Sequence, residues 1–328
     1  MQNAANGHPG LPACGRDASS PTTSAPPPPA PDSRARDRLP LALLFGLCLT
    51  STAERHLLPR VARSWCSGSV NASAGTTDAF PASLTERDVA ALLFIADMYA
   101  VQLDQLAAIL GVTEARARAI TLAWRRARYA ESARIGPGRP WIWLTRAGLS
   151  ACGLPYRPAS PALSRLAHLR AAISVRLAFE AAPGYARAGA FWRGERRLRA
   201  AAGGRVGLRE HIPDGEVHWP DGAPVSFAGE CWAIEAELTR KTVARTAAIM
   251  QEILGRTGDY GCPAGQARVP GAAPRHARVV YLCAPAAVPT VARARAALGE
   301  TGRRVEIRSL PPGADMAGPA GATGERAR

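Results

Sequence analysis

The stretch Cys-Trp-Ala-Ile-Glu-Ala-Glu-Leu-Thr-Arg-Lys, residues 231–241, decides what the second half of this chain can be. Apolar residues occupy every second position from 232 to 238, with Glu235 and Glu237 between them, which predicts a β-strand, because strand side chains point to opposite faces in turn. Trp232 and the alternate apolar residues after it share one face, and Glu235 and Glu237 project together from the other. The upstream run His-Ile-Pro-Asp-Gly-Glu-Val, residues 211–217, predicts a preceding antiparallel strand that starts at Asp214.

If these two strands pair, three carboxylates gather in one patch: Asp214, Glu235 and Glu237. Carboxylate oxygens are the ligands that Mg²⁺ and Mn²⁺ prefer in proteins. The pattern therefore predicts a divalent-metal site. Glu195, upstream in the chain, is a candidate to add a further carboxylate to it. His211 and His218 flank Asp214, and we interpret both as strand residues rather than as ligands.

Lys241 is the single lysine of the chain, because 41 residues are Lys or Arg and 40 of them (41 − 1) are arginine. An ammonium group can shift its pKa and stabilise a leaving phosphate, whereas a guanidinium group stays protonated. The position of Lys241 after Glu235 and Glu237 predicts that its charge assists catalysis electrostatically. The alternative is an ordinary surface lysine at the start of a helix.

Length and charge limit the classes of protein to consider. A chain of 328 residues with 47% apolar content favours two compact domains with tails. A net charge of +15 points to a polyanionic partner, most simply double-stranded DNA, although a GC-rich coding sequence also enriches arginine. The seven cysteines form neither a Cys-x-x-Cys pair nor a zinc-type cluster, which indicates reduced cysteines in a cytoplasmic protein.

Both ends of the chain have the composition of disordered tails. Residues 1–83 are rich in Pro, Ala, Ser and Gly, and residues 311–328 are rich in Gly, Ala and Pro. The apolar run 39–49 begins too far from the N-terminus for a signal peptide and is too short to span a bilayer, so we expect no membrane segment. A misassigned start codon would also account for residues 1–83, and whether they belong to the real protein stays open.

Residues 84–153 predict a compact helical module. Thr85 is a candidate helix cap with Asp88 in a capping-box position, and a second helix ends at Gly111. Thr113 caps a third helix that runs to about 128. Its predicted polar stripe is Glu114, Arg118, Thr121, Arg125 and Arg128, and its predicted apolar side is Ala119, Ile120, Ala123 and Ala127.

Two strand-like runs, 129–135 and 141–144, follow with a Gly-Pro-Gly-Arg-Pro turn between them, and a short helix begins at Thr145. Three helices and a hairpin predict a winged helix-turn-helix. The third helix would enter the major groove of DNA through Arg118, Thr121, Arg125 and Arg128, and Arg139 at the wing tip would meet the backbone or minor groove. The alternative is a helical module that binds protein partners.

A proline-rich linker, 154–161, leads to a second predicted domain, 162–310. Its elements are expected in the order helix, strand 185–192, the two acid-bearing strands, helix 239–254, strand 278–283, helix 286–298 and strand 304–309. Trp192 and Trp232 are interpreted as core residues. The predicted fold class is therefore α+β or α/β, in two domains, with a mixed sheet flanked by helices.

The order of these elements, with Asp214 on one strand and Glu-x-Glu on the next, resembles the PD-(D/E)xK nuclease-like fold. The features that carry a wider resemblance are the winged helix ahead of the sheet, His168 on the linking helix, the step at Trp192 and Glu195-Arg196, His211-Ile-Pro-Asp-Gly and Glu235-Ala-Glu237. Through these features, residues 84–310 as a whole are similar to the replication-relaxation family of actinobacterial and Firmicutes mobile elements. The resemblance implies DNA binding in plasmid replication, relaxation or mobilisation, with replication or conjugation proteins as candidate partners.

The chain departs from the nuclease signature at Glu237, where the family pattern has a lysine, and Lys241 is the candidate to return that cation. Three functions stay open. The first is a DNA-binding protein with a degenerate nuclease-like domain. The second is a Mg²⁺- or Mn²⁺-dependent nuclease or nickase that uses Asp214, Glu235, Glu237 and Lys241. The third is a winged-helix transcription regulator with a dimerisation domain.

Overall fold

The computed structural model describes residues 84–136, 138–202, 211–258 and 273–314. The predicted tail at 1–83 lies outside them, as do residues 315–328. Residues 311–314 form a turn in which Ala314 is buried, so the prediction that the disordered tail starts at 311 is wrong for this short segment.

The first part of the described chain begins with three helices, α3 (Glu86–Asp97), α4 (Leu103–Leu110) and α5 (Glu114–Arg126). The predicted capping box is present, because Thr85 Oγ1 accepts from the Asp88 amide and Asp88 Oδ2 accepts from the Thr85 amide. Gly111 ends α4 in the left-handed conformation, with a φ of 64°, and the Thr113 side chain caps α5 as predicted.

A small antiparallel sheet accompanies these helices. Its strands are β1 (Val101–Gln102), β3 (Trp141–Leu144) and β2 (Ala130–Ala133), in that spatial order, and α6 (Arg146–Ala151) follows β3. The predicted hairpin is present as β2 and β3, and the predicted short helix follows Thr145 as α6. β1 was not predicted, since two residues are too few to show an alternating pattern.

The second part is built on a five-stranded mixed sheet with the spatial order β4-β5-β6-β7-β8. Neighbouring strands from β4 to β6 are antiparallel, and those from β6 to β8 are parallel. The strands span Phe191–Gly194 (β4), Gly215–His218 (β5), Cys231–Glu237 (β6), Arg278–Cys283 (β7) and Val305–Ser309 (β8). A mixed sheet with flanking helices was predicted, and β7 has the predicted bounds.

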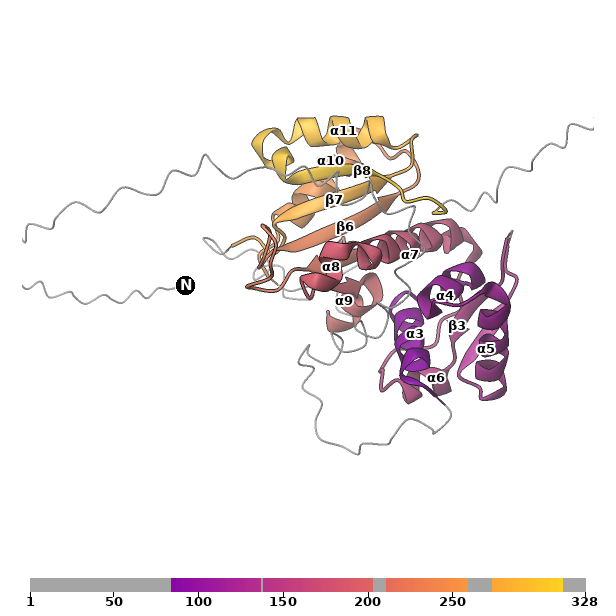
Figure 1. The fold of residues 1–328 in the computed structure, drawn as a ribbon. Coiled ribbons are helices and arrows are strands. Elements are labelled where there is room, and N and C mark those ends of the chain that lie inside the picture. Colours follow the sequence, from indigo (N-terminus) through magenta and orange to yellow (C-terminus); the bar gives the residue numbers. More distant parts are fainter. Residues whose placement is uncertain (1–83, 137, 203–210, 259–272, 315–328) are drawn as a thin grey trace, which may run out of the picture. The chain divides into compact units, whose positions relative to one another are not determined.

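Helices cover both faces of this sheet (Figure 1). On one face Ala233, Val279 and Tyr281 pack against α10 and α11, which make the crossovers between the parallel strands. α7 lies against β6 on the other face. The helices span Leu163–Arg165 (η2), Leu166–Ala181 (α7), Pro183–Arg187 (α8), Glu195–Ala201 (α9), Val243–Leu254 (α10), Val288–Ala297 (α11) and Gly299–Arg304 (η3). In the described ranges no helix has the length and apolar character that crossing a membrane requires.

α7 also packs against the first part of the chain. Leu166, Leu169 and Ile173 are buried in the same apolar cluster as the residues of α3, α4 and β3. Gln105 of α4 donates to the Arg170 carbonyl at 3.0 Å, and Arg170 forms a two-pronged ion pair with Asp104. The helix that follows the proline-rich segment therefore completes the core of the part that precedes it.

Two local predictions are wrong. Residues 185–192 were expected as a strand, but Pro183 starts the short helix α8 and Gly189, with a φ of 66°, redirects the chain before β4 begins at Phe191. The helix expected from 239 begins at Val243, because the Thr242 side chain supplies its N-terminal cap.

Candidate functional site

Asp214 and Glu235 lie close enough for their charges to interact, because the charge of Asp214 raises the pKa of Glu235. Asp214 directly precedes β5, whose first residue, Gly215, pairs with Ile234 of β6. Asp214 Oδ2 also accepts a hydrogen bond of 2.8 Å from the Ala236 amide. The structure thus brings together two of the three predicted metal ligands near the end of β6, with Glu235 on the sheet face that α10 covers.

The glycine after Asp214 is required by close packing. A Cβ atom at Gly215 would lie 2.1 Å from the ring of Trp192, which is buried on the neighbouring strand β4. No side chain larger than hydrogen fits there without moving the indole ring. The Pro-Asp-Gly sequence therefore fixes Asp214 at the point where β5 joins the sheet.

Each of the two carboxylates has a histidine partner. His168 Nε2 of α7 lies 2.7 Å from Asp214 Oδ1, and His211 Nε2 lies 2.7 Å from Glu235 Oε1. The His211 amide in turn donates to Glu252 of α10 at 2.6 Å. His211 was interpreted as a strand residue, but it lies before β5 begins at Gly215. Neither histidine was predicted to contact a carboxylate, since each pair joins segments that are distant in the sequence.

Burial and neighbouring charges shift the pKa values of Asp214 and Glu235 in opposite directions. Burial raises the pKa of Asp214, but the His168 imidazolium outweighs it and holds the pKa below the ordinary value. The same ion pair raises the pKa of His168 to about 9, so this histidine is charged at neutral pH. Burial raises the pKa of Glu235 against the opposing effect of His211.

The side chain of Lys241 returns to the end of β6. Its Nζ lies 2.5 Å from Glu237 Oε2, and its charge also opposes the effect of burial on the pKa of Glu235. Glu237 is therefore paired with the lysine rather than placed between the other two acids. Glu195 is engaged elsewhere, because Arg165 and Arg199 each bind its carboxylate, although its amide donates to the Asp214 carbonyl.

We refer to Asp214, Glu235, Glu237 and Lys241 as the acid site. Asp214 and Glu235 fit an oxygen-seeking divalent cation, provided that water or a phosphate supplies the remaining ligands. Glu237 fits less well as a ligand, because Lys241 occupies its Oε2. His168 and His211 contact the carboxylate oxygens that such a cation would also contact.

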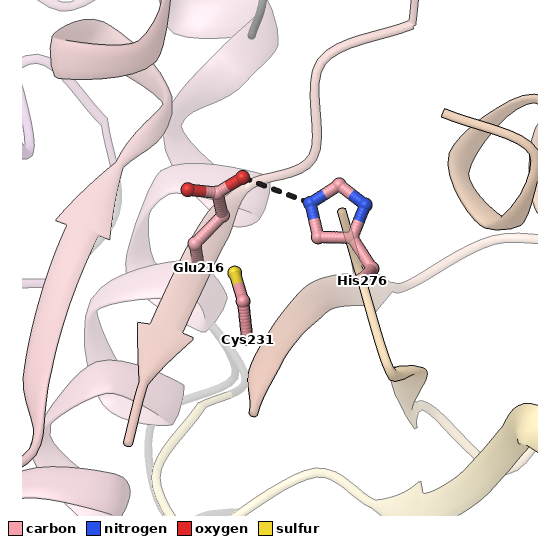
Figure 2. A group of neighbouring side chains, drawn as sticks. All are labelled: Glu216, Cys231 and His276. Atoms are coloured by element: carbon pink, nitrogen blue, oxygen red, sulfur yellow. Dashed lines mark hydrogen bonds and ion pairs between the residues drawn. The ribbon is translucent and has the colours of Figure 1, made fainter. Parts of the chain in front are cut away.

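A second polar group lies on the same sheet face, at the opposite end of β6. Glu216, Cys231 and His276 bring one ligand atom each within 4.8 Å of one another, the one compact group of three possible metal ligands found among the residues described (Figure 2). His218 joins them, with Nε2 2.9 Å from Glu216 Oε2 and 3.7 Å from Cys231 Sγ. We call these four residues the Glu216 cluster.

Sequence reasoning missed this cluster. The spacing Glu216-x-His218 and the position of Cys231 on the next strand are signals of a shared face that the sequence does contain. His276 lies far along the chain and gave no signal. Burial raises the pKa of Glu216, but hydrogen bonds from His218, His276 and Arg275 outweigh it and hold the pKa well below the ordinary value.

The exposed side of α5 is a third candidate site. Its buried residues are Ala117, Ile120, Thr121 and Trp124. The predicted faces are therefore partly wrong: Thr121 is only 4% exposed and its hydroxyl donates to the Ala117 carbonyl, so it cannot contact DNA. Ala119, Ala123 and Ala127, expected on the apolar side, are exposed.

Arginines dominate that exposed side. Arg116, Arg118, Arg125 and Arg126 are exposed, and none of them forms an ion pair with another described residue. Leu122, 45% exposed, lies with Arg125, Arg126 and Glu131 of β2 around a shallow hollow. Arg128 is exposed but follows the helix, with a φ of 62°, and Arg139 is bound to Glu114 at 2.7 Å.

Comparisons with protein-family models, with curated proteins and with solved structures find no match to this chain. The function proposed below depends on the geometry and charge of the chain itself.

Proposed function

We propose that the protein binds double-stranded DNA and that α5 is the element that enters the major groove. The observation that carries this proposal is the set of exposed arginines on α5 without acidic partners among the described residues. Unpaired guanidinium groups on a helix suit both phosphate oxygens and the O6 and N7 acceptors of guanine.

The local arrangement supports the same role. α4 and α5 are joined by a three-residue turn, 111–113, that contains a glycine, as in a helix-turn-helix. The hairpin of β2 and β3 follows α5, in the position of a wing. The net charge of +15 supports it further, since phosphate neutralisation supplies much of the affinity of DNA-binding proteins.

We assign this binding to the replication, relaxation or mobilisation of a plasmid or integrative element. The support is the succession of a winged-helix arrangement, a linking helix that carries His168, and a mixed sheet in which Asp214 faces the Glu235-Ala-Glu237 strand. In this assignment the sheet positions DNA or recruits replication and transfer proteins.

Substitution of two arginines tests the role of α5. In the Arg118→Ala/Arg125→Ala variant, we expect the affinity for labelled random-sequence duplexes to fall about 10-fold or more, and the slope of log K against log salt to fall by about one per lost phosphate contact. Fluorescence anisotropy at several salt concentrations measures both quantities.

The matched control is Arg293→Ala/Arg295→Ala, which removes the same charge from two exposed positions on α11. This variant should keep nearly all of the affinity. Equal losses in the two double variants would mean that bulk charge binds DNA and would remove α5 as the reading element.

A second candidate function is metal-dependent hydrolysis of DNA, favoured by the proximity of Asp214 and Glu235. Bound Mg²⁺ or Mn²⁺ would supply polarisation of a phosphoryl oxygen and a more acidic water. Asp214 and Glu235 would hold that cation, and Lys241 would place a positive charge beside the phosphate. His168 and His211 would exchange their present contacts for contacts with water or phosphate.

Supercoiled plasmid incubated with the protein and Mg²⁺ or Mn²⁺ separates the two functions. Nicking that is lost in Asp214→Asn but kept in Glu300→Gln, a change at an exposed acid of η3, supports the nuclease. No nicking at high protein concentration, with DNA binding intact, supports a binding protein alone. Promoter-specific binding that metal does not affect would instead favour a transcription regulator with a dimerisation domain.

A further inference from the structure

We propose that the Glu216 cluster is a zinc site, with Glu216, His218, Cys231 and His276 as its four ligands. The site lies apart from the acid site and does not depend on the DNA-binding function. Glu216 and His218 come from β5, Cys231 from β6 and His276 from the segment before β7. A donor set of one thiolate, two imidazoles and one carboxylate is one that Zn²⁺ binds in proteins.

The separation of Cys231 and His218 is close to that of two ligands in a tetrahedral site. With Zn–S near 2.3 Å and Zn–N near 2.0 Å, the sulfur and nitrogen corners of a tetrahedron lie about 3.6 Å apart. Cys231 Sγ and His218 Nε2 are 3.7 Å apart. The imidazole Nε2 atoms of His276 and His218 lie 2.8 and 2.9 Å from Oε1 and Oε2 of Glu216, and a bound ion would take the place of these hydrogen bonds.

His276 is oriented as a metal-binding histidine usually is. Its Nδ1 donates to the Ile253 carbonyl at the end of α10, with 3.2 Å between the atoms, and its Nε2 points at Glu216 (Figure 2). A ligating histidine commonly donates its other ring nitrogen to a backbone carbonyl, which fixes the ring and the tautomer. This contact holds the completely buried ring with its Nε2 toward Glu216, the orientation that a ligand role requires.

The neighbouring charges decide which cation the cluster prefers. Arg275 donates to both oxygens of Glu216, at 2.7 and 2.9 Å, and Arg193 Nη1 lies 3.6 Å from Oε2. A cation held by oxygen alone, such as Mg²⁺, would have to displace these guanidinium groups. Zn²⁺ gains its binding energy from the thiolate and the imidazoles, so it can share the carboxylate with Arg275.

The position of the ligands indicates a structural rather than a catalytic metal. Glu216 and His276 have no exposed surface, and four protein ligands leave no position open for a substrate. The ion would join β5, β6 and the segment before β7 beneath the end of α10. It would therefore fix the end of the sheet opposite the acid site.

Metal titration of the full-length protein tests this proposal. Protein freed of metal by chelation is titrated with Zn²⁺ alone, and bound metal is measured by mass spectrometry. We expect each chain to hold one equivalent of Zn²⁺ tightly. Replacement of Zn²⁺ by Co²⁺ should give the visible absorption of a tetrahedral cobalt site together with a thiolate-to-cobalt band.

Three variants locate the metal. Cys231→Ser should weaken zinc binding about 100-fold or more and abolish the thiolate band, since even an outer-shell partner contributes 10- to 100-fold. His218→Gln should weaken binding while keeping the thiolate band, which covers the case in which Cys231→Ser does not fold. Cys152→Ser, a change at a buried cysteine outside the cluster, should alter neither.

Asp214→Asn separates this site from the acid site and should leave zinc binding unchanged. Failure of the wild-type protein to retain zinc while circular dichroism shows it folded would overturn the proposal. Retention that is indifferent to both Cys231→Ser and His218→Gln would overturn it equally. In either case the Glu216 cluster would be a metal-free network of ion pairs.

Discussion

Arg176 of α7 and Asp97 at the end of α3 form an ion pair of 2.9 Å between Nη1 and Oδ2, with side chains only 1% and 3% exposed. The same oxygen of Asp97 accepts a hydrogen bond of 3.1 Å from the Gly194 amide at the start of α9. Burial raises the pKa of Asp97 against the effect of Arg176. One carboxylate thus joins the helical part of the chain to the linking helix and to the five-stranded sheet.

Removal of Arg176 should therefore be costly. Arg176→Met leaves the Asp97 carboxylate buried without its cation, and we expect the free energy of unfolding to fall by about 3–5 kcal/mol. Urea denaturation at neutral pH measures this change. The double variant Asp97→Asn/Arg176→Met should lose less than the sum of the two single losses. Strictly additive losses would show that the pair does not act as a unit. The control is Arg303→Met, which breaks an exposed ion pair with Glu300 and should cost less than about 1 kcal/mol.

The ion pair of Asp104 and Arg170 predicts a dependence of stability on pH. Burial raises the pKa of Asp104, but the hydrogen bonds and charge of Arg170 outweigh it and lower the pKa below 3.8. A depressed folded-state pKa stabilises the protein above the unfolded value and loses that effect as the pH falls through the folded value. Asp104→Asn should thus cost about 1–3 kcal/mol at pH 7 and progressively less below about pH 4. Urea midpoints from pH 7 to pH 3 measure it, and a cost that stays constant over this range would contradict the assignment.

Gly215 provides a test of packing next to the acid site. In Gly215→Ala the new methyl group meets the indole ring of Trp192 at 2.1 Å, so we expect a loss of about 1–3 kcal/mol from overpacking. Trp192→Phe removes part of that ring, and the double variant should recover some of the stability lost in Gly215→Ala. Thermal denaturation of the four proteins measures the coupling. No recovery in the double variant would place the strain elsewhere than against Trp192.

Thr121 and Arg126 distinguish the two descriptions of α5. Thr121→Val removes a buried hydroxyl that donates to the Ala117 carbonyl, so the affinity for DNA should change by less than about 2-fold. Arg126→Ala removes an exposed cation on the side opposite the buried residues and should weaken binding by severalfold. Fluorescence anisotropy with the same duplexes measures both changes. The reverse result would restore the polar stripe expected from sequence and reject the buried position of Thr121.

The prediction of which side of α5 is buried depended on one residue, Trp124. Alanine is compatible with either face of a helix, so Ala119 and Ala123 carried little information about the direction of the core. Trp124, with Ala117, Ile120 and Thr121, fills the helical spacing i, i+3, i+4 and i+7 that marks the buried side. The large indole side chain, rather than the small residues, decides the phase of the helix.

The strands of the second part were easier to predict than its polar contacts. Alternation in β6 and the unbroken apolar run of β7 are local patterns, and they gave bounds close to those observed. The partners of the buried charges are not local: His168 reaches Asp214 over 46 residues, and His276 reaches Glu216 over 60. Only the fold determines which of these side chains meet.

The packing of α7 has a practical consequence for how the chain can be divided. A fragment cut within the proline-rich segment 154–161 would leave the first three helices without the apolar cover that Leu166, Leu169 and Ile173 provide. Solubility and cooperative unfolding of such a fragment would suffer, because an uncovered apolar surface promotes aggregation. A boundary placed after Ala181 keeps that surface covered but uncovers the side of α7 that lies against β6, so α7 serves the packing of both halves and a cut on either side of it exposes apolar residues.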